Sequence, residues 1–331
     1  MQAITYPERG RVSRTALPDP TPGPGEVLVR VMASGICHTD LEILHGNYGA
    51  DAFPVIPGHE FAGIVGGLGA GVTGLAEGDR VVVDPNLGCG ACPACARGWA
   101  HLCTALGAYG VTRPGGFADL CVVRAAAVHP IGDMPFAMAA LAEPMGCVLN
   151  GIDAVDPQVT ETALIFGAGA IGLLMAIALR TRGIDRIALV DLDAARLELA
   201  RGFGFEALAA GSAVLEDRRQ AIDFVADATG VPEVAGTLTR YIANGGRGLY
   251  FGVCPQPARI EIAPFEMFRR QITLAGTHSL NHNIPQALQA MSDFGPDIAG
   301  LVSHRLDLDG VARIMAEGAP KGSLKIQARW A

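Results

Sequence analysis

The fold is decided by residues 162–191, which read TALIFGAGAIGLLMAIALRTRGIDRIALVD. The apolar run at 162–166 predicts a strand, the helical period at 170–182 predicts a helix, and the apolar run at 186–191 predicts a second strand. The alternation continues downstream, where we expect helices at 194–202 and 232–243 and strands at 221–227, 247–253 and 271–276. Strands that alternate with helices in this way are typical of a doubly wound parallel sheet.

A glycine motif joins the first strand to the first helix. Gly167, Gly169 and Gly172 have the spacing Gly-x-Gly-x-x-Gly, which is a weak signal alone but a specific one between a strand and a helix. The first glycine would form the turn, the second would admit a pyrophosphate and the third would allow close helix packing. Ala170 and Ile171 open the helix, whose N-terminal N–H groups suit an anion. The motif predicts a dinucleotide site.

An acidic residue closes the second strand. Asp191 lies where a carboxylate binds both hydroxyls of the adenosine ribose, and this charge disfavours a 2′-phosphate. Leu192 follows it, rather than arginine or serine, so we expect NAD rather than NADP. Arg196 on the next helix is a further candidate for cofactor binding, although a solvated side chain is the simpler interpretation.

Four of the eight cysteines lie within fifteen residues: Cys89, Cys92, Cys95 and Cys103. The segment is otherwise rich in glycine, proline and alanine and has little to bury, so core packing does not explain them. Four thiolates at this spacing can enclose a tetrahedral Zn²⁺ and leave no open position. A redox Cys-x-x-Cys pair or an iron–sulfur cluster is the alternative. We expect a structural zinc.

A second group of metal ligands is spread more widely. Cys37 follows an expected strand, His59 stands beside Glu60 in Pro-Gly-His-Glu, and Glu143 precedes the nucleotide-binding unit. Each residue alone is more often structural. Together, a thiolate, an imidazole and a carboxylate make a three-ligand zinc site with room for water or substrate. Such a zinc can bind an alcohol and stabilise the alkoxide that releases hydride.

Length and patterning predict two domains. At 331 residues the chain exceeds what one core usually supports. Up to about residue 137, short apolar runs alternate with glycine and proline, as at 27–31, 80–83 and 116–123, which predicts an antiparallel barrel-like domain. A helical period at 139–154 leads into the parallel-sheet region, and the tail offers a helix at 284–293 and a closing strand at 324–329. The expected fold class is α/β.

Charge excludes two classes of function. The formal net charge is −8, and the chain has no run of basic residues. Nonspecific binding to nucleic acid or to an anionic membrane needs clustered Lys and Arg. The opening residues, MQAITYPERG, lack the charged-then-apolar pattern of a secretory signal, so we expect a cytoplasmic protein.

In their order along the chain, these motifs resemble the zinc-containing medium-chain dehydrogenase/reductase family over nearly the whole sequence. The resemblance implies a GroES-like catalytic domain at 1–150 that carries both zincs. It implies an NAD-binding Rossmann domain at 151–279 and a segment at 280–331 that returns to the first domain. The active site would lie in the cleft against the Rossmann domain. A homodimer or homotetramer is also implied, with the strand at 271–276 extending the sheet across subunits.

Site roles follow from the resemblance. Cys37 and His59 would bind the catalytic zinc, and Thr39 would accept the alcohol proton. Glu143 stands where alcohol dehydrogenases of the family have a third cysteine, and its Glu-Pro pair resembles sorbitol and xylitol dehydrogenases. There this glutamate and the one matching Glu60 share the metal, and which of them binds directly is open. His38 and Lys325 would approach the pyrophosphate.

The sequence also departs from the family. Glu42 replaces a histidine that ends the proton relay in many members, a place that His45 or water would have to take. Ser279 stands where sorbitol dehydrogenase has an arginine that holds a substrate hydroxyl, which disfavours sorbitol itself.

The motifs predict reversible oxidation of a secondary alcohol to a ketone by NAD and one catalytic zinc, with a second, structural zinc. The resemblance implies that the alcohol is a polyol or sugar alcohol. The same chemistry on a simple alcohol, on an amino alcohol such as threonine or on a sugar aldehyde is the alternative. A non-enzymatic NAD-sensing or structural protein is a third hypothesis, which the complete set of site residues disfavours. A zinc-free quinone reductase would have no use for the cysteines at 89–103.

Overall fold

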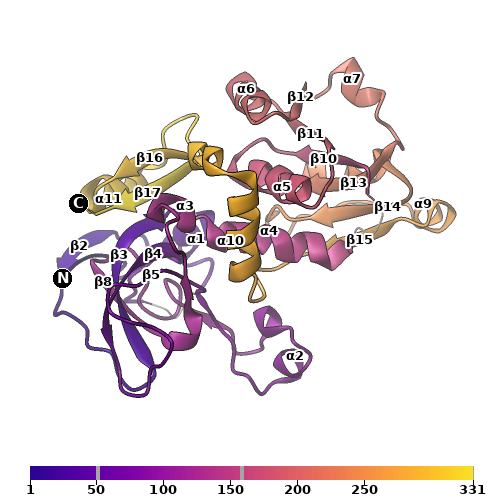
Figure 1. Ribbon diagram of the computed structural model, residues 1–331. Coiled ribbons are helices and arrows are strands. Elements are labelled where there is room, and N and C mark those ends of the chain that lie inside the picture. Colours follow the sequence, from indigo (N-terminus) through magenta and orange to yellow (C-terminus); the bar gives the residue numbers. More distant parts are fainter. Residues whose placement is uncertain (50–52, 157–159, 331) are drawn as a thin grey trace. The chain divides into compact units, whose positions relative to one another are not determined.

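The computed structural model describes residues 1–49, 53–156 and 160–330 (Figure 1). The chain divides into two compact units, one formed by Met1–Glu143 with Ile298–Ala331 and the other by Pro144–Asp297. The sequence had placed the boundaries after residues 150 and 279. The second boundary differs because α10 (Ile284–Phe294) packs its buried face, including Ile284 and Met291, against α5 of the second unit.

The first unit is built on a seven-stranded sheet. Its order is β16 (Val302–Leu306), β17 (Lys325–Arg329), β3 (Glu26–Gly35), β4 (Glu60–Leu68), β5 (Arg80–Val83) and β9 (Val128–Pro130), and β8 (Leu120–Arg124) also pairs with β3. All these pairs are antiparallel except β16 with β17. The alternation in β3 buries Val27, Val29 and Val31 in the core, as the pattern predicted.

Smaller elements surround this sheet. Two further strand pairs are β1 (Gln2–Thr5) with β2 (Ser13–Ala16) and β6 (Asn86–Leu87) with β7 (Gly107–Ala108). The helices are α1 (His38–Leu44), α2 (Pro93–Ala96), α3 (Phe136–Ala139) and α11 (Leu308–Glu317), and α4 (Ala142–Val155) begins at the unit's edge. Figure 1 shows α2 on a lobe that projects away from the strands.

The second unit is a six-stranded parallel sheet. Its order is β12 (Glu206–Ala209), β11 (Arg186–Asp191), β10 (Thr162–Phe166), β13 (Ile222–Asp227), β14 (Ile242–Tyr250) and β15 (Thr273–Gly276). Its helices are α5 (Ala170–Thr181), α6 (Ala194–Gly202), α7 (Ala213–Glu216), α8 (Pro232–Ala235), α9 (Pro264–Arg270) and α10. The strand order reverses between β10 and β13, so the loops after these two strands flank the switch point of the sheet.

One expected helix was wrong. The period at 232–243 gives only the short α8, a 3₁₀ turn at Leu238–Arg240 and then β14, which starts at Ile242. Gly236 ends α8, the 3₁₀ turn follows it, and Ile242 pairs with Ile222 of β13 as the first residue of β14. Tertiary pairing here overrides the local helical period.

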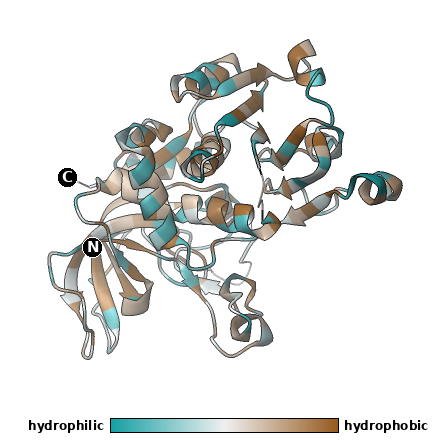
Figure 2. Cartoon of the chain, turned by 45° about the vertical axis from the view of Figure 1, so that its right-hand side comes forward, coloured by the Kyte–Doolittle hydropathy of each residue, from teal (hydrophilic) through white to brown (hydrophobic). Residues whose placement is uncertain are grey.

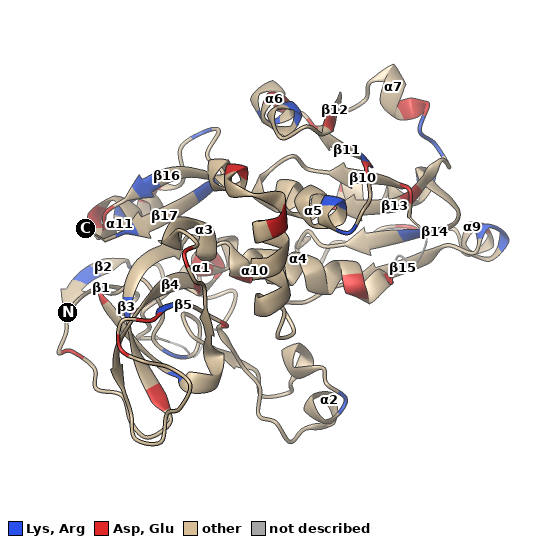
Figure 3. Cartoon of the chain, in the orientation of Figure 1, with Lys and Arg blue, Asp and Glu red and all other residues tan. Residues whose placement is uncertain are grey.

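The distribution of side chains agrees with this architecture. Figure 2 shows hydrophobic residues along the strands of both units. Figure 3 shows Lys and Arg dispersed among Asp and Glu, with no basic stripe over the part of the chain that the structure describes. No helix within the described ranges is long and apolar enough to cross a membrane.

Candidate metal and dinucleotide sites

The projecting lobe brings its four cysteines together. The Sγ atoms of Cys89, Cys92, Cys95 and Cys103 all lie within 4.8 Å of one another. Cys92 caps α2, Cys95 lies inside that helix, and Cys103 follows the 3₁₀ turn at Ala100–Leu102. Helix α2 buries no residue, so the lobe has no apolar core in this region to hold the four side chains at one point.

Backbone N–H groups of the lobe point at the sulfurs. Cys89 N–H donates to the Sγ of Cys103, and Cys92 N–H donates to the Sγ of Cys89, each at 3.3 Å. The N–H groups of Cys95 and Thr104 lower the pKa of Cys92 to about 5. Backbone donors also lower the pKa of Cys89, whereas burial raises the pKa of Cys95. Four sulfurs at one point in a lobe without an apolar core fit a tetrahedral metal ion, whose charge would stabilise all four thiolates.

The second group lies where β3 meets β4. Cys37 caps α1 just after β3, and His59 and Glu60 stand at the start of β4. The two strands pair with Gly35 opposite Glu60, which places the three side chains close together. One ligand atom from each of Cys37, His59 and Glu60 lies within 4.8 Å of the others, and His59 and Glu60 are buried.

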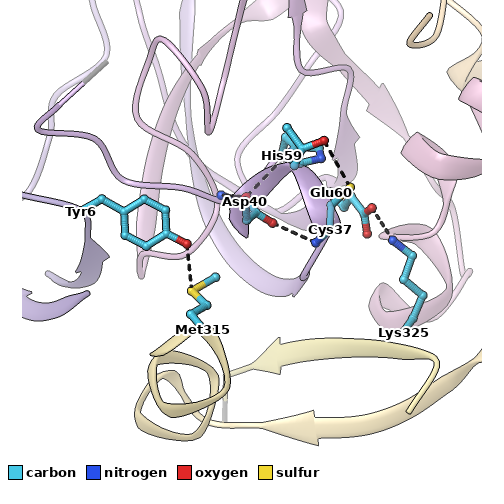
Figure 4. A network of polar contacts seen from close by, with 9 residues as sticks. Tyr6, Cys37, Asp40, His59, Glu60, Met315 and Lys325 are labelled. Carbon is cyan, nitrogen blue, oxygen red and sulfur yellow. Dashed lines mark hydrogen bonds and ion pairs between the residues drawn. The ribbon is translucent and has the colours of Figure 1, made fainter. Parts of the chain in front are cut away.

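Asp40 holds this group in place, and the sequence analysis missed it (Figure 4). Its Oδ2 accepts the N–H of Cys37 at 2.9 Å, and its Oδ1 accepts the N–H of Gly58 at 3.1 Å. The same Oδ1 lies 3.5 Å from Nδ1 of His59. Nδ1 of His59 makes no hydrogen bond among the described residues, so this contact is an ion-pair distance. A fully buried carboxylate beside Nδ1 favours a metal ion on the other ring nitrogen, Nε2.

Lys325 enters the group from β17. Its Nζ pairs with Oε1 of Glu60, and both side chains are buried (Figure 4). Oε2 of Glu60 is buried without a hydrogen-bond partner among the described residues. The ammonium of Lys325 is paired with Glu60, and the approach of Lys325 to a pyrophosphate, which the resemblance implies, stays a prediction.

The group creates a field that favours a cation. Burial opposes the charge on His59, yet Asp40 and Cys37 raise the pKa of His59 well above its ordinary value. Burial likewise opposes the charge on Lys325, and Glu60, Cys37 and Glu143 nevertheless raise the pKa of Lys325. Thiolate, imidazole and an unsatisfied carboxylate oxygen in such a field fit a divalent metal such as zinc.

The other predicted residues lie nearby. The Oγ1 of Thr39 is 3.6 Å from the Sγ of Cys37. Glu143 is buried in the first turn of α4, within electrostatic reach of Lys325, but it lies outside the compact three-residue group. The ring of His38 is largely exposed, and its Nε2 lies 3.3 Å from Glu42.

The three glycines of the dinucleotide loop are required for different structural reasons. Gly167 has φ +102°, which a side chain rarely adopts. A Cβ on buried Gly172 would lie far closer than 3.0 Å to the carbonyl oxygen of Gly167, so packing within the protein requires glycine there. A Cβ on Gly169 would meet only Arg196, at 3.8 Å. Nothing in this unit explains the absence of a side chain at Gly169, which is the expected result if a ligand approaches the loop at that point. Ala170 and Ile171 stand half-exposed in the first turn of α5.

Asp191 is fixed at the end of β11. It accepts the N–H of Ala168 at 2.8 Å and that of Asp193 at 2.9 Å, which ties the acid to the glycine loop. Nη1 of Arg196 lies 3.8 Å from Asp191, so the arginine borders this site, and Leu192 is exposed.

A second loop at the switch point was also missed. Asp227, fully buried at the end of β13, accepts the N–H of Thr229 at 2.8 Å and that of Gly230 at 3.3 Å. A Cβ on Gly167 would come within 3.1 Å of Thr229, so the two loops lie side by side. No motif in the sequence singled out this acid, because its partners are backbone groups.

Known proteins match both units. Residues 23–133 match the alcohol dehydrogenase GroES-like domain, and residues 170–293 match the zinc-binding dehydrogenase domain. The chain is 51% identical over 312 residues to the D-altritol 5-dehydrogenase of Agrobacterium fabrum, with 93% of each chain covered. It is 32% identical to D-arabinitol dehydrogenase 1 of Uromyces fabae, over 91% of this chain and 89% of that one. It is 33% identical to an L-threonine 3-dehydrogenase of Streptomyces coelicolor, over 87% and 88%.

Solved structures agree. A protein of Sinorhizobium meliloti described as a zinc-binding dehydrogenase, bound to NADP, superposes with a TM-score of 0.92 at 32% identity and covers 99% of both chains. An Escherichia coli alcohol dehydrogenase bound to NADH gives a TM-score of 0.90 at 25% identity, covering 100% of this chain and 99% of that one. The chain belongs to the zinc-binding alcohol dehydrogenases of the medium-chain dehydrogenase/reductase family, and it is an oxidoreductase.

Proposed function

We propose that this protein oxidises a secondary hydroxyl of a polyol to a ketone with NAD, and that a hexitol of the altritol type is its substrate. The observation that carries the proposal is the 51% identity, over 93% of the chain, to a D-altritol 5-dehydrogenase. The D-arabinitol dehydrogenase, a more distant relative, points to the same class of substrate.

Two zincs per chain belong to the proposal. Cys89, Cys92, Cys95 and Cys103 would hold the structural one, because four thiolates close the coordination shell. Cys37, His59 and Glu60 would hold the catalytic one, because their ligand atoms lie together and those of Glu143 lie outside the group. When bound there, zinc supplies a Lewis acid that lowers the pKa of an alcohol.

The protein's own residues carry the remaining tasks. The hydroxyl of Thr39, beside Cys37, would take the proton of the substrate alcohol and pass its own proton on toward the coenzyme ribose and solvent. Asp40 would orient His59, and the loop from Gly167 to Gly172 would hold the pyrophosphate at the N-terminus of α5. Glu143, buried close by, would contribute negative charge to the site.

NAD is proposed over NADP because of Asp191. Its carboxylate is pinned by two N–H groups and would repel a 2′-phosphate. Arg196, 3.8 Å away, could accommodate such a phosphate only by leaving this carboxylate. Comparing kcat/KM for the two coenzymes tests this point, and a preference for NADP would contradict it.

We also propose an oligomeric state and a cellular location for the protein. A homodimer or homotetramer would use β15, which pairs with one neighbour, β14, and stands at the edge of its sheet. A cytoplasmic location is proposed with it. Light scattering in solution would test the assembly, and a monomer at micromolar concentration would contradict it.

L-threonine is the second candidate substrate, because several relatives of about this length are L-threonine 3-dehydrogenases. One experiment tests both: NAD reduction with altritol, other C4 to C6 polyols, simple alcohols and threonine, paired with zinc counting. We expect two zincs and the highest kcat/KM on a hexitol. If the protein oxidised threonine and no polyol, L-threonine would be the substrate in place of a hexitol. If it contained one zinc per chain, one of the two proposed zinc sites would be wrong.

A further inference from the structure

The chain has two lysines, Lys321 and Lys325, although it has 25 basic Lys and Arg residues in all. Arginine therefore serves almost everywhere that this protein needs a cation. Lys321 is exposed, whereas Lys325 is buried and touches Glu60. The use of lysine at the buried position calls for a reason that arginine would not satisfy.

Geometry around Glu60 supplies that reason. An ammonium is a compact point charge, whereas a guanidinium is a planar fork that matches both oxygens of a carboxylate. Lys325 contacts Oε1 of Glu60, and Oε2 is left buried without a hydrogen-bond partner among the described residues. A carboxylate oxygen of Glu60 is at the same time within 4.8 Å of the ligand atoms of Cys37 and His59.

Gly35 leaves room for the carboxylate of Glu60. It faces Glu60 across the β3–β4 pair, and a Cβ at Gly35 would lie far closer than 3.0 Å to Oε2. The glycine thus keeps open the space that the second oxygen occupies. Three strands, β3, β4 and β17, fix where each oxygen of Glu60 lies.

We propose that Lys325 is a positioning residue that makes Glu60 a one-oxygen metal ligand: it occupies Oε1 and leaves one oxygen for the metal. This inference rests on the metal site of the proposed function. A carboxylate that binds through one oxygen leaves a coordination position for an alcohol, whereas binding through both would crowd that position. The role is separate from contact with substrate or coenzyme.

Two substitutions at this position should move metal binding in opposite directions. In Lys325→Met both oxygens are released and one positive charge leaves the site, so we expect the metal to bind more tightly. In Lys325→Arg the fork should engage both oxygens and withdraw Glu60, so we expect weaker binding. Each change should reach roughly tenfold or more, the scale on which groups around ligands tune metal affinity. Lys321→Met is the matched control.

The test uses the full-length protein with Co²⁺ exchanged into the catalytic site and zinc left in the cysteine lobe. Competition with a chelator gives the affinity, and the visible absorption of Co²⁺ reports the coordination number. We expect Lys325→Met to lose absorption intensity as the coordination number rises, and to lose kcat while its Kd for NADH stays at the wild-type value. Lys321→Met should match wild type in every measurement.

A purely structural lysine predicts a different order. Lys325→Arg would then resemble wild type, and Lys325→Met would bind metal more weakly because the site is disturbed. That order, or unchanged spectra in both variants, would overturn the inference. The proposed function would fail for different reasons. If the wild-type protein bound no metal at Cys37, the proposed catalytic site would be wrong. If it bound metal but did not oxidise polyols, the proposed substrate would be wrong, and the spectra of the Lys325 variants could still be compared.

Discussion

Substitution of Gly172 by alanine tests the assignment of structural and ligand-facing glycines in the dinucleotide loop. The added Cβ would collide with the carbonyl oxygen of Gly167, a backbone atom that cannot rotate away. Overpacking of this kind lowers the free energy of unfolding by about 1–3 kcal/mol. We expect a loss of about 3 kcal/mol here, because the atom that the Cβ meets belongs to the backbone. For a unit of this size, that corresponds to a fall in Tm of about 6–12 °C. Calorimetry on the full-length protein measures it.

Gly169→Ala is the matched variant. Its Cβ would meet only Arg196, at 3.8 Å, and the backbone at Gly169 has φ −76°, which alanine adopts readily. We expect a stability loss of at most about 1 kcal/mol from a weaker helix cap. NADH affinity should fall by roughly tenfold or more, about 1.4 kcal/mol, because the Cβ occupies the approach of the pyrophosphate. Equal Tm values for Gly172→Ala and wild type, or unchanged NADH affinity in Gly169→Ala, would refute this reasoning.

Three further substitutions address the metal sites and the proton acceptor. Thr39→Val should lower kcat by roughly 10²- to 10⁴-fold while zinc content and NADH affinity stay constant, since only the proton acceptor is lost; retained turnover would assign the proton to another group. Asp40→Asn should weaken catalytic-site metal binding by roughly 10- to 100-fold, because an amide donor would face the N–H of Cys37 or Gly58. The control is Asp309→Asn on the exposed face of α11, which should bind metal as wild type does. Cys92→Ser should leave one zinc per chain by atomic emission and speed proteolysis near α2; a count of two would show that the lobe holds its metal without Cys92.

Local signals made the parallel-sheet unit predictable. The expected bounds of β10, β11 and α6 are those of the structure, because each element is specified by the periodicity of its own residues and by a turn beside it. The glycine loop and Asp191 were placed by the same short-range pattern. The cysteine lobe was equally local, since its four sulfurs come from one fifteen-residue segment.

Contacts between residues far apart in the sequence could not be predicted from local sequence patterns. Lys325 is 265 residues from Glu60, and only the return of β17 to the edge of β3 brings them together. Asp40 is three residues from Cys37, yet its importance depends on Gly58 and His59 on the far side of a loop. The helix expected at 232–243 failed for a related reason, because pairing with β13 selects a strand from a sequence that also suits a helix.

The return of β17 also sets an order of events during synthesis. The parallel-sheet unit is one continuous segment, Pro144–Asp297, and can fold as soon as that segment has left the ribosome. The first unit starts earlier but must wait, because its sheet lacks β16 and β17 until residues 302–329 are made. In the interval residues 33–35 of β3 lack the strand that pairs with them in the finished sheet, and Cys37, His59 and Glu60 stand without the ammonium of Lys325. We therefore expect the nascent chain to pass through a state in which the sheet is incomplete and Glu60 lacks its cation, until synthesis of β17 supplies both the strand and the ammonium.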